Sequence, residues 1–247
     1  MRIHLIEGEA GCRYAAESGC VAVIVDALRA SATAAMLLHA GASRLFVTGD
    51  LDAARAARDR LEGALLYGER GGLPPEGFDG GNSPRLLGDV RGKTVVFTTT
   101  TGAGRLVASW GAPGVYMGTP LNAQAVIARA QSHGRDVAVI PAGLATDPHF
   151  DAQEDWAAAA ALVMRMSGDI GHGAGQFAQW RRRIEAEGLD ALFHAAPHAE
   201  KLRRVGLDDD ISYCARFDLT GAVPCAVRRE AQGVWVTDGR GMPGEQS

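Results

Sequence analysis

A run of apolar, mostly β-branched residues that ends in a single aspartate limits most strongly what this chain can fold into. Val21–Val25 reads VAVIV, which predicts a strand buried on both faces of a sheet. Asp26 follows at once, and alanines and leucines at helical density continue to about His39. A buried strand that turns into a helix is typical of open α/β sheets, in which ligands bind at the carboxyl ends of the strands. We therefore expect the functional site at this turn.

The turn itself carries charged and hydroxyl side chains. A carboxylate such as Asp26 at the end of a buried strand is costly unless it is paired. Ser31 is suited to cap the helix that follows, and the free N–H groups of a first helical turn favour an anion. Arg29 lies between the two and can hold an anion as a guanidinium fork.

Composition excludes several other classes of protein. The 247 residues are 47% hydrophobic and 22% charged, which is ordinary for a globular protein with one large core or two modest ones. A net charge of −4 argues against nucleic acid as a partner. The chain has no apolar run of membrane-spanning length and no signal peptide at its start, so we expect a cytoplasmic protein without a membrane partner. The four cysteines form no CxxC pair, which predicts reduced, buried thiols.

Strands and helices alternate along most of the chain, which predicts a three-layer α/β/α architecture with a largely parallel or mixed sheet. We expect a single domain over residues 1–247 with a frayed tail at 239–247. The predicted strands after the first are 45–47, 65–67, 94–97, 115–117, 137–140, 223–227 and 234–236. The predicted helices are 51–61, 105–110, 122–130, 154–166 and parts of 171–201, and Asp50 is suited to cap the first of these.

One pattern occurs twice. A strand, a polar turn, a helix, a Gly-Ala pair and a second strand begin at Val21 and recur from Thr94. This repetition indicates an internal βαβ duplication. Three apolar strands, 21–25, 94–97 and 137–140, lead into polar loops, and we expect these loops at one edge of one sheet.

The segment 68–84 is rich in glycine and proline, which predicts a loop. It also carries Glu69, Arg70, Asp79, Asn82 and Ser83, and a long polar loop inside a compact domain is often functional.

The threonine run that begins at Thr98 has two interpretations. Threonine favours strands, so the run can be a strand end. With Gly102 and Gly104 it can equally form a nest of hydroxyl and amide groups for phosphate, although no Walker sequence follows.

The acidic segment Asp151–Asp155 also has two interpretations. Asp151 and Glu154 have the spacing of a capping box, which leaves Asp155 over. Adjacent carboxylates at a helix start can instead bind a hard cation. The histidines show no HxH or HxxxH spacing and the chain has no GxSxG elbow, which argues against a histidine metal site and against the commonest hydrolase nucleophile.

Together these fragments resemble the 2-phosphosulfolactate phosphatase family. The resemblance is carried by Asp26-Ala-Leu-Arg-Ala-Ser31, Gly68-Glu69, Gly77–Pro84, the threonine turn, Glu154-Asp155 and Asp210, and it spans about residues 21–227. It implies a magnesium-dependent phosphatase that hydrolyses a small acidic phosphomonoester, 2-phosphosulfolactate, to sulfolactate and phosphate on the pathway to coenzyme M. The family turn usually reads Thr-Thr-Thr-Asn-Gly-Thr, whereas this chain has Thr100-Thr101-Gly102-Ala103.

The resemblance and the residues together give a set of expected roles. Asp26 and Arg29 are the catalytic candidates. Asp26 can ligate Mg²⁺ or attack phosphorus to form an aspartyl-phosphate. It can also act only as a structural acid that pairs with Arg29 or with backbone N–H groups of the turn. The expected Mg²⁺ ligands are Asp26, Asp79, Glu154 and Asp155. The expected substrate-binding residues are Ser31, Arg70, Asn82, Ser83, Thr98, Thr99, Thr100, Gly102 and Arg105.

Two other functions stay open. The chain can be a phosphatase for a related phospho-hydroxyacid, or a binding protein for a small organic anion that has lost catalysis. The missing Asn in the threonine turn favours the second alternative. The expected partner is a small anionic phosphomonoester, and a homodimer is the expected assembly.

Overall fold

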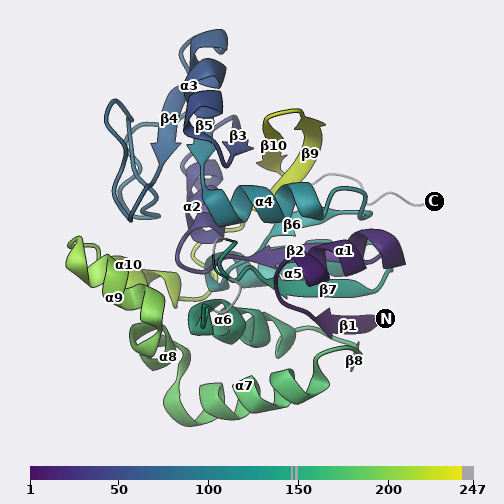
Figure 1. Ribbon diagram of the computed structural model, residues 1–247. Helices are drawn as coiled ribbons and strands as arrows, with labels where there is room; N and C mark the ends of the chain where they lie inside the picture. The colour runs from purple at the N-terminus through teal and green to yellow at the C-terminus, as the bar shows by residue number, and fades with distance from the viewer. Residues whose placement is uncertain (146, 148–149, 241–247) are drawn as a thin grey trace.

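The computed structural model describes residues 1–145, 147 and 150–240, and it contains a ten-stranded sheet with helices on both faces (Figure 1). This confirms the predicted α/β architecture and the mixed sheet. The strands are β1 (Arg2–Leu5), β2 (Val21–Val25), β3 (Arg44–Thr48), β4 (Leu65–Gly68), β5 (Thr94–Thr98), β6 (Val115–Met117), β7 (Val137–Pro141), β8 (Asp169–Ile170), β9 (Pro224–Glu230) and β10 (Gly233–Asp238).

Helices fill most of the remaining chain, and α1 and α4 cover one face of the sheet in Figure 1. The helices are α1 (Gly8–Ser18), α2 (Ala30–His39), α3 (Leu51–Arg60), α4 (Thr100–Ala108), η1 (Pro120–Asn122), α5 (Ala123–Gln131), α6 (Gln153–Val163), α7 (Ala174–Glu187), α8 (Leu189–Ala195), α9 (Pro197–Arg204) and α10 (Asp209–Cys214).

The sheet consists of two parallel blocks of opposite direction. Its order is β4-β5-β3-β10-β9-β6-β2-β7-β1-β8. The strands β4, β5 and β3 are parallel to one another, as are β6, β2, β7, β1 and β8, and the antiparallel pair β9–β10 joins the two blocks. Figure 1 shows the blocks set at a large angle to each other, which follows from the accumulated twist of so many strands.

The strand pairing agrees with the predicted duplication. The first unit is β2-α2-β3 and the second is β5-α4-β6. β2 pairs with β6, and β5 pairs with β3, which is the pairing that two copies related by a local two-fold axis would make. The helices α2 and α4 also begin side by side, because a Cβ atom on Gly102 would lie 3.1 Å from the Cβ of Ala30.

This arrangement corrects the expectation that three loops share one edge of a parallel sheet. β5 runs opposite to β2 and β7, so its carboxyl end lies at the other edge of the ladder. The turns after β2 and β5 nevertheless meet, since Asp26 and Thr99 line one cavity and Gly102 lies against Ala30.

Several local predictions depend on which side chain caps a helix. Asp50 caps α3 as its carboxylate accepts from the Ala53 N–H at 2.7 Å. The predicted capping box at Asp151 is wrong, since α6 begins at Gln153 after Ala152 and has no side-chain cap. Ser31 does not cap α2, whose N-cap is Arg29.

The helix expected from Arg105 begins earlier, at Thr100, so the threonine turn is the first turn of α4. The helix α1 was not predicted from the sequence.

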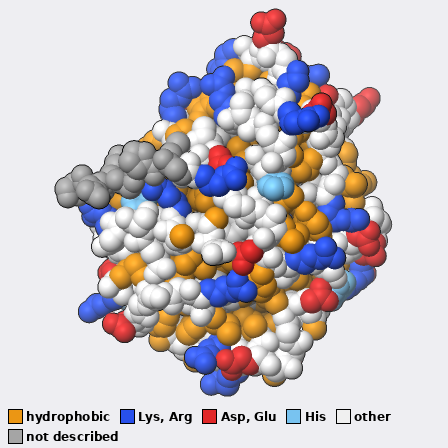
Figure 2. All heavy atoms as spheres, turned by 180° about the vertical axis from the view of Figure 1, so that it is seen from behind, with side chains coloured by type: hydrophobic (Ala, Val, Ile, Leu, Met, Phe, Trp, Pro, Cys, Tyr) orange, Lys and Arg blue, Asp and Glu red, His pale blue; other side chains and the backbone are white. Residues whose placement is uncertain are grey.

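The remaining features of the chain bear on its class. The four cysteines are buried and form no disulfide, as predicted. Of the expected frayed tail, Gly239 and Arg240 are hydrogen-bonded, and residues 241–247 lie outside the described part of the chain. None of the described helices is both long and apolar enough to cross a membrane. On the face shown in Figure 2, basic and acidic side chains are interspersed among apolar ones.

Candidate active site

A cavity of 140 Å³ lies where the turns after β2 and β5 meet. The segment 68–84 covers part of it, and α9 and the loop after β7 complete the wall. Most of its polar lining comes from residues that the sequence singled out. The lining residues are Asp26, Leu28, Arg29, Glu69, Gly72, Asn82, Thr99, Thr100, Thr101, Leu144 and His198.

The backbone of the turn after β2 fixes Asp26 at the cavity wall. Its Oδ1 accepts the Ala30 N–H at 3.0 Å. The Ser31 hydroxyl accepts the Asp26 N–H at 3.0 Å and donates to the Ile24 carbonyl at 3.1 Å. Ser31 is fully buried and stabilises the turn, so its hydroxyl is occupied. Among the described residues, none donates a hydrogen bond to Asp26 Oδ2, which leaves this oxygen for a ligand.

Two more carboxylates, Glu154 and Asp155, are buried at the start of α6, next to the turn that carries Asp26. Asp155 accepts two backbone N–H groups, from Ala27 at 2.8 Å and from Gly143 at 3.0 Å. Its side chain thus ties the turn after β2 to the loop after β7. Glu154 Oε1 lies 3.3 Å from His198 Nδ1, whereas Glu154 Oε2 is buried without a partner among the described residues.

Burial and the repulsion of neighbouring carboxylates disfavour the charged forms of Asp26 and Asp155. Desolvation raises the pKa of Asp155 well above its usual range, and the charges of Glu154 and Asp26 add to the rise. Desolvation also raises the pKa of Asp26, more than the Ala30 N–H and His198 lower it. A cluster of this kind stores unfavourable energy that a bound cation relieves.

We predict that the pH dependence of stability reveals this cost. The folded protein holds the Asp26 proton to a higher pH than the unfolded chain, so the metal-free protein loses stability as the pH rises above about 4. Asn at this position does not ionise. The free energy of unfolding of Asp26→Asn minus that of the wild type should therefore increase toward neutral pH. Chemical unfolding of both proteins in a chelator at several pH values measures the difference, and a constant difference would contradict the prediction.

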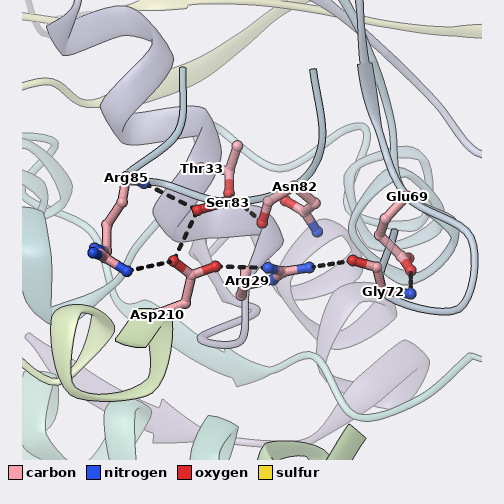
Figure 3. A network of polar contacts seen from close by, with 8 residues as sticks. All are labelled: Arg29, Thr33, Glu69, Gly72, Asn82, Ser83, Arg85 and Asp210. Atoms are coloured by element: carbon pink, nitrogen blue, oxygen red, sulfur yellow. Dashed lines mark hydrogen bonds and ion pairs between the residues drawn. The ribbon is translucent and has the colours of Figure 1, made fainter. Parts of the chain in front are cut away.

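Arg29 is held in a buried network that Figure 3 shows. Its Nη1 donates to Asp210 Oδ2 at 2.6 Å and its Nη2 donates to the Gly72 carbonyl at 3.1 Å. The side chains of Arg29 and Asp210 are 2% and 0% exposed. Ser83 donates its hydroxyl to Asp210 Oδ1 at 2.8 Å, so the network joins the segment 68–84 to α10. Arg29 still lines the cavity, but both Nη groups are engaged.

Asn82 belongs to the segment 68–84 and lies in the cavity wall. Its carbonyl accepts the Thr33 hydroxyl at 3.1 Å, which fixes the backbone on α2. Its side chain lines the cavity, and the Oδ1 atom is buried without a partner among the described residues. The side-chain amide is therefore available to a ligand.

The threonine turn contributes mainly through the helix that it begins. Thr99, Thr100 and Thr101 line the cavity at the amino end of α4, where unpaired N–H groups favour an anion. Thr98 is fully buried and accepts from Arg70 at 3.3 Å. Gly102 packs against Ala30, so its role in the structure is close helix contact.

Nine of the expected site residues do not line this cavity: Ser31, Arg70, Asp79, Ser83, Thr98, Gly102, Arg105, Glu154 and Asp155. Asp79, Arg70 and Arg105 are bound to other parts of the structure. Asp79 accepts the Leu66 N–H at 2.8 Å and lies 4.0 Å from Arg58 of α3. Arg70 donates to the Gly49 carbonyl at 2.7 Å. Arg105 donates to the Ala142 carbonyl at 2.8 Å and lines a neighbouring hollow of 360 Å³, which shares Leu144 with the cavity.

Two titratable residues of the cavity were not among the expected site residues. His198 lines the cavity from α9, and Glu69 lines it from the end of β4, where its carboxylate accepts the Gly72 N–H at 2.7 Å. Nothing in the spacing of the histidines points to His198. Two features of the sequence pointed to Glu69: it is one of the polar residues of the segment 68–84, and it belongs to the Gly68-Glu69 fragment of the family resemblance.

A larger hollow of 740 Å³ lies between α3, α4 and the β9–β10 turn. It is wider and more open than the small cavity, but Asp26 of the β2 turn is not among its lining residues. The chemistry therefore points to the small cavity. A small, polar, largely buried space suits a compact anion better than a broad surface hollow does.

The donor set fits a hard divalent cation. Mg²⁺ typically takes one or two carboxylates and keeps several waters. Asp26 Oδ2 and Glu154 Oε2 are carboxylate oxygens without other partners among the described residues, whereas both Asp155 oxygens accept N–H groups. Among the described residues, no three His, Cys, Asp or Glu side chains converge on one point, so a site with many protein ligands does not fit.

Comparison with known proteins agrees with the resemblance noted above. The sequence model of the 2-phosphosulpholactate phosphatase family matches residues 10–229. The chain is 36% identical over 214 residues to a protein of Deinococcus radiodurans, which covers 84% of this chain and 88% of that one. It is 32% identical over 209 residues to a protein of Carboxydothermus hydrogenoformans, which covers 82% and 84%. Both relatives are named probable 2-phosphosulfolactate phosphatase. The chain belongs to the 2-phosphosulpholactate phosphatase family.

Proposed function

We propose that this protein hydrolyses 2-phosphosulfolactate to sulfolactate and phosphate in the cavity at Asp26, and that Mg²⁺ is its cofactor. The observation that carries the proposal is a buried carboxylate, Asp26, that shares a small cavity with the amino end of α4. The names of the relatives support the substrate. In the reaction the oxygen of water ends on phosphorus, and the ester oxygen leaves with a proton as the hydroxyl of sulfolactate.

Neutral hydrogen-bond donors position the phosphoryl group. The N–H groups at the start of α4 and the side-chain amide of Asn82 hold the phosphoryl oxygens, and the hydroxyls of Thr99 and Thr101 are beside them. Such preorganised donors stabilise the charge that develops in the transition state. Arg29 presents its guanidinium at the wall and keeps the Gly72 backbone in place.

Asp26 Oδ2 and Glu154 Oε2 are the atoms that would hold Mg²⁺, which supplies charge neutralisation for the phosphoryl group when bound. Alternatively, Asp26 Oδ2 would attack phosphorus and form an aspartyl-phosphate that water then hydrolyses. The hydrogen bond from Ala30 to Oδ1 fixes the carboxylate for either role. Asp155 orients the two loops and supplies no free oxygen.

Release of inorganic phosphate from a panel of substrates tests the proposal. We expect turnover of 2-phosphosulfolactate with Mg²⁺, slower turnover of related phospho-hydroxyacids, and none after chelation. A ligand-induced rise in melting temperature without turnover of any phosphomonoester would instead support the binding protein. The expected cytoplasmic location and homodimer remain predictions; the oligomeric state is measurable by light scattering.

We predict that Mg²⁺ stabilises the folded protein through Glu154. Addition of the cation should raise the melting temperature of the wild type, since ligand binding to the folded state alone stabilises it. Glu154→Gln keeps the shape of the side chain but lacks the charged Oε2, so the rise should shrink or disappear. Differential scanning calorimetry with and without Mg²⁺ measures both. An equal rise in the two proteins would exclude Glu154 as a ligand.

A further inference from the structure

The two oxygens of Glu154 are in different situations. The side chain is 1% exposed. Its Oε1 lies 3.3 Å from His198 Nδ1, and its Oε2 has no partner among the described residues. Leaving a carboxylate oxygen buried and unpaired is costly. Oε1 contacts His198 and Oε2 contacts none of the described residues, which indicates that Oε2 binds a ligand.

The Glu154 side chain does not cap its own helix. Glu154 is the second residue of α6, and no side chain caps the first turn of this helix. The N–H groups of an uncapped first turn attract a carboxylate on the same turn. The carboxylate instead contacts His198, which lines the cavity, whereas Glu154 itself is buried behind the lining residues.

His198 is itself held in place by its neighbours. It is in the first turn of α9, and its ring meets the ring of Phe150 edge-on, with centroids 6.1 Å apart and planes at 88°. Lys201, three residues further along α9, places its Nζ 4.6 Å from the centroid of the Phe150 ring. These contacts fix the imidazole between α9 and the start of α6.

We propose that His198 is a positioning residue that holds Glu154 Oε1, so that Oε2 faces a divalent cation. The inference rests on the proposed function, because it needs the cation. Ligands of a metal are commonly oriented by hydrogen bonds from residues behind them, and loss of such a partner typically weakens metal affinity about 10- to 100-fold.

Three variants separate this role from others. His198→Ala removes the contact with Glu154. His198→Asn places an amide nitrogen near the position of Nδ1 and retains the donor. His194→Gln is a matched control, because His194 lies on α8 and contacts Ser212 at 2.8 Å instead of Glu154. Circular dichroism and thermal unfolding confirm that each variant is folded.

The affinity of metal-stripped protein for Mn²⁺, read from the electron paramagnetic resonance signal of the free ion, requires no turnover. We expect the Kd to rise about 10- to 100-fold in His198→Ala, and to stay within a few-fold of the wild type in His198→Asn and His194→Gln. Unchanged Mn²⁺ affinity in His198→Ala would overturn the inference, even if turnover were lost. A wild-type protein that binds no Mn²⁺ and no Mg²⁺ would overturn the cation in the proposed function as well.

Discussion

Replacing Asp26 with Asn is expected to lower kcat/KM for 2-phosphosulfolactate by on the order of 10³-fold or more, because a neutral amide holds a cation more weakly than a carboxylate and does not attack phosphorus. The variant should remain folded, since its Oδ1 still accepts the Ala30 N–H. Burial raises the pKa of the native carboxyl, so the amide removes a cost of ionisation as well. Steady-state kinetics and thermal unfolding of the same preparations measure the two effects.

A purely structural Asp26 predicts the opposite pair of results. In that case Asp26→Asn loses stability and the folded fraction keeps its turnover. Turnover near the wild-type level in a folded variant would remove Asp26 from the catalytic machinery. A trapped phosphate mimic such as fluoroberyllate, if it were covalently attached to the native Asp26, would distinguish a nucleophile from a metal ligand.

Replacing Asp210 with Ala is expected to lower the free energy of unfolding by about 3–5 kcal/mol, because it leaves the Arg29 charge buried without its partner. The two side chains are almost completely buried, and their N···O distance is 2.6 Å. Arg29→Lys should cost nearly as much, about 2–4 kcal/mol, because a single ammonium does not span Asp210 and the Gly72 carbonyl together. Urea unfolding measures both losses.

The adjacent aspartate supplies a matched control. Asp209 is 72% exposed and pairs with Arg85 at 2.9 Å, so Asp209→Ala should change stability by about 1 kcal/mol or less. A loss in Asp210→Ala no larger than that in Asp209→Ala would contradict the account of Arg29 as a buried structural pair.

The sequence predicted the fold well where the structure of a helix or strand depends on residues close to it in the chain. The apolar run at Val21–Val25 is a central strand buried on both faces, and Asp50 caps its helix as the short-range pattern indicates. Repetition in the sequence also predicted the two units that bring Asp26 and Thr99 to one cavity. These features depend on periodicity and on contacts within a few residues.

Partners that are far apart in the chain were not predictable in the same way. Arg29 is paired with Asp210, 181 residues away, and Glu154 is drawn to His198 instead of completing a capping box. Asp79 is in a polar loop beside the site, but its carboxylate turns back to the β4 backbone at Leu66. Each outcome depends on how α9, α10 and the segment 68–84 pack, and the spacing of residue types does not contain that information.

A crystal structure of the protein grown with Mg²⁺ and inorganic phosphate tests the central claim most directly. The account predicts phosphate in the 140 Å³ cavity, against the amino end of α4 and Asn82, with the cation between it and Asp26 and Glu154. Phosphate that occupied only the 740 Å³ hollow beside α3, with no ion near Asp26, would contradict the assignment of this cavity as the catalytic centre.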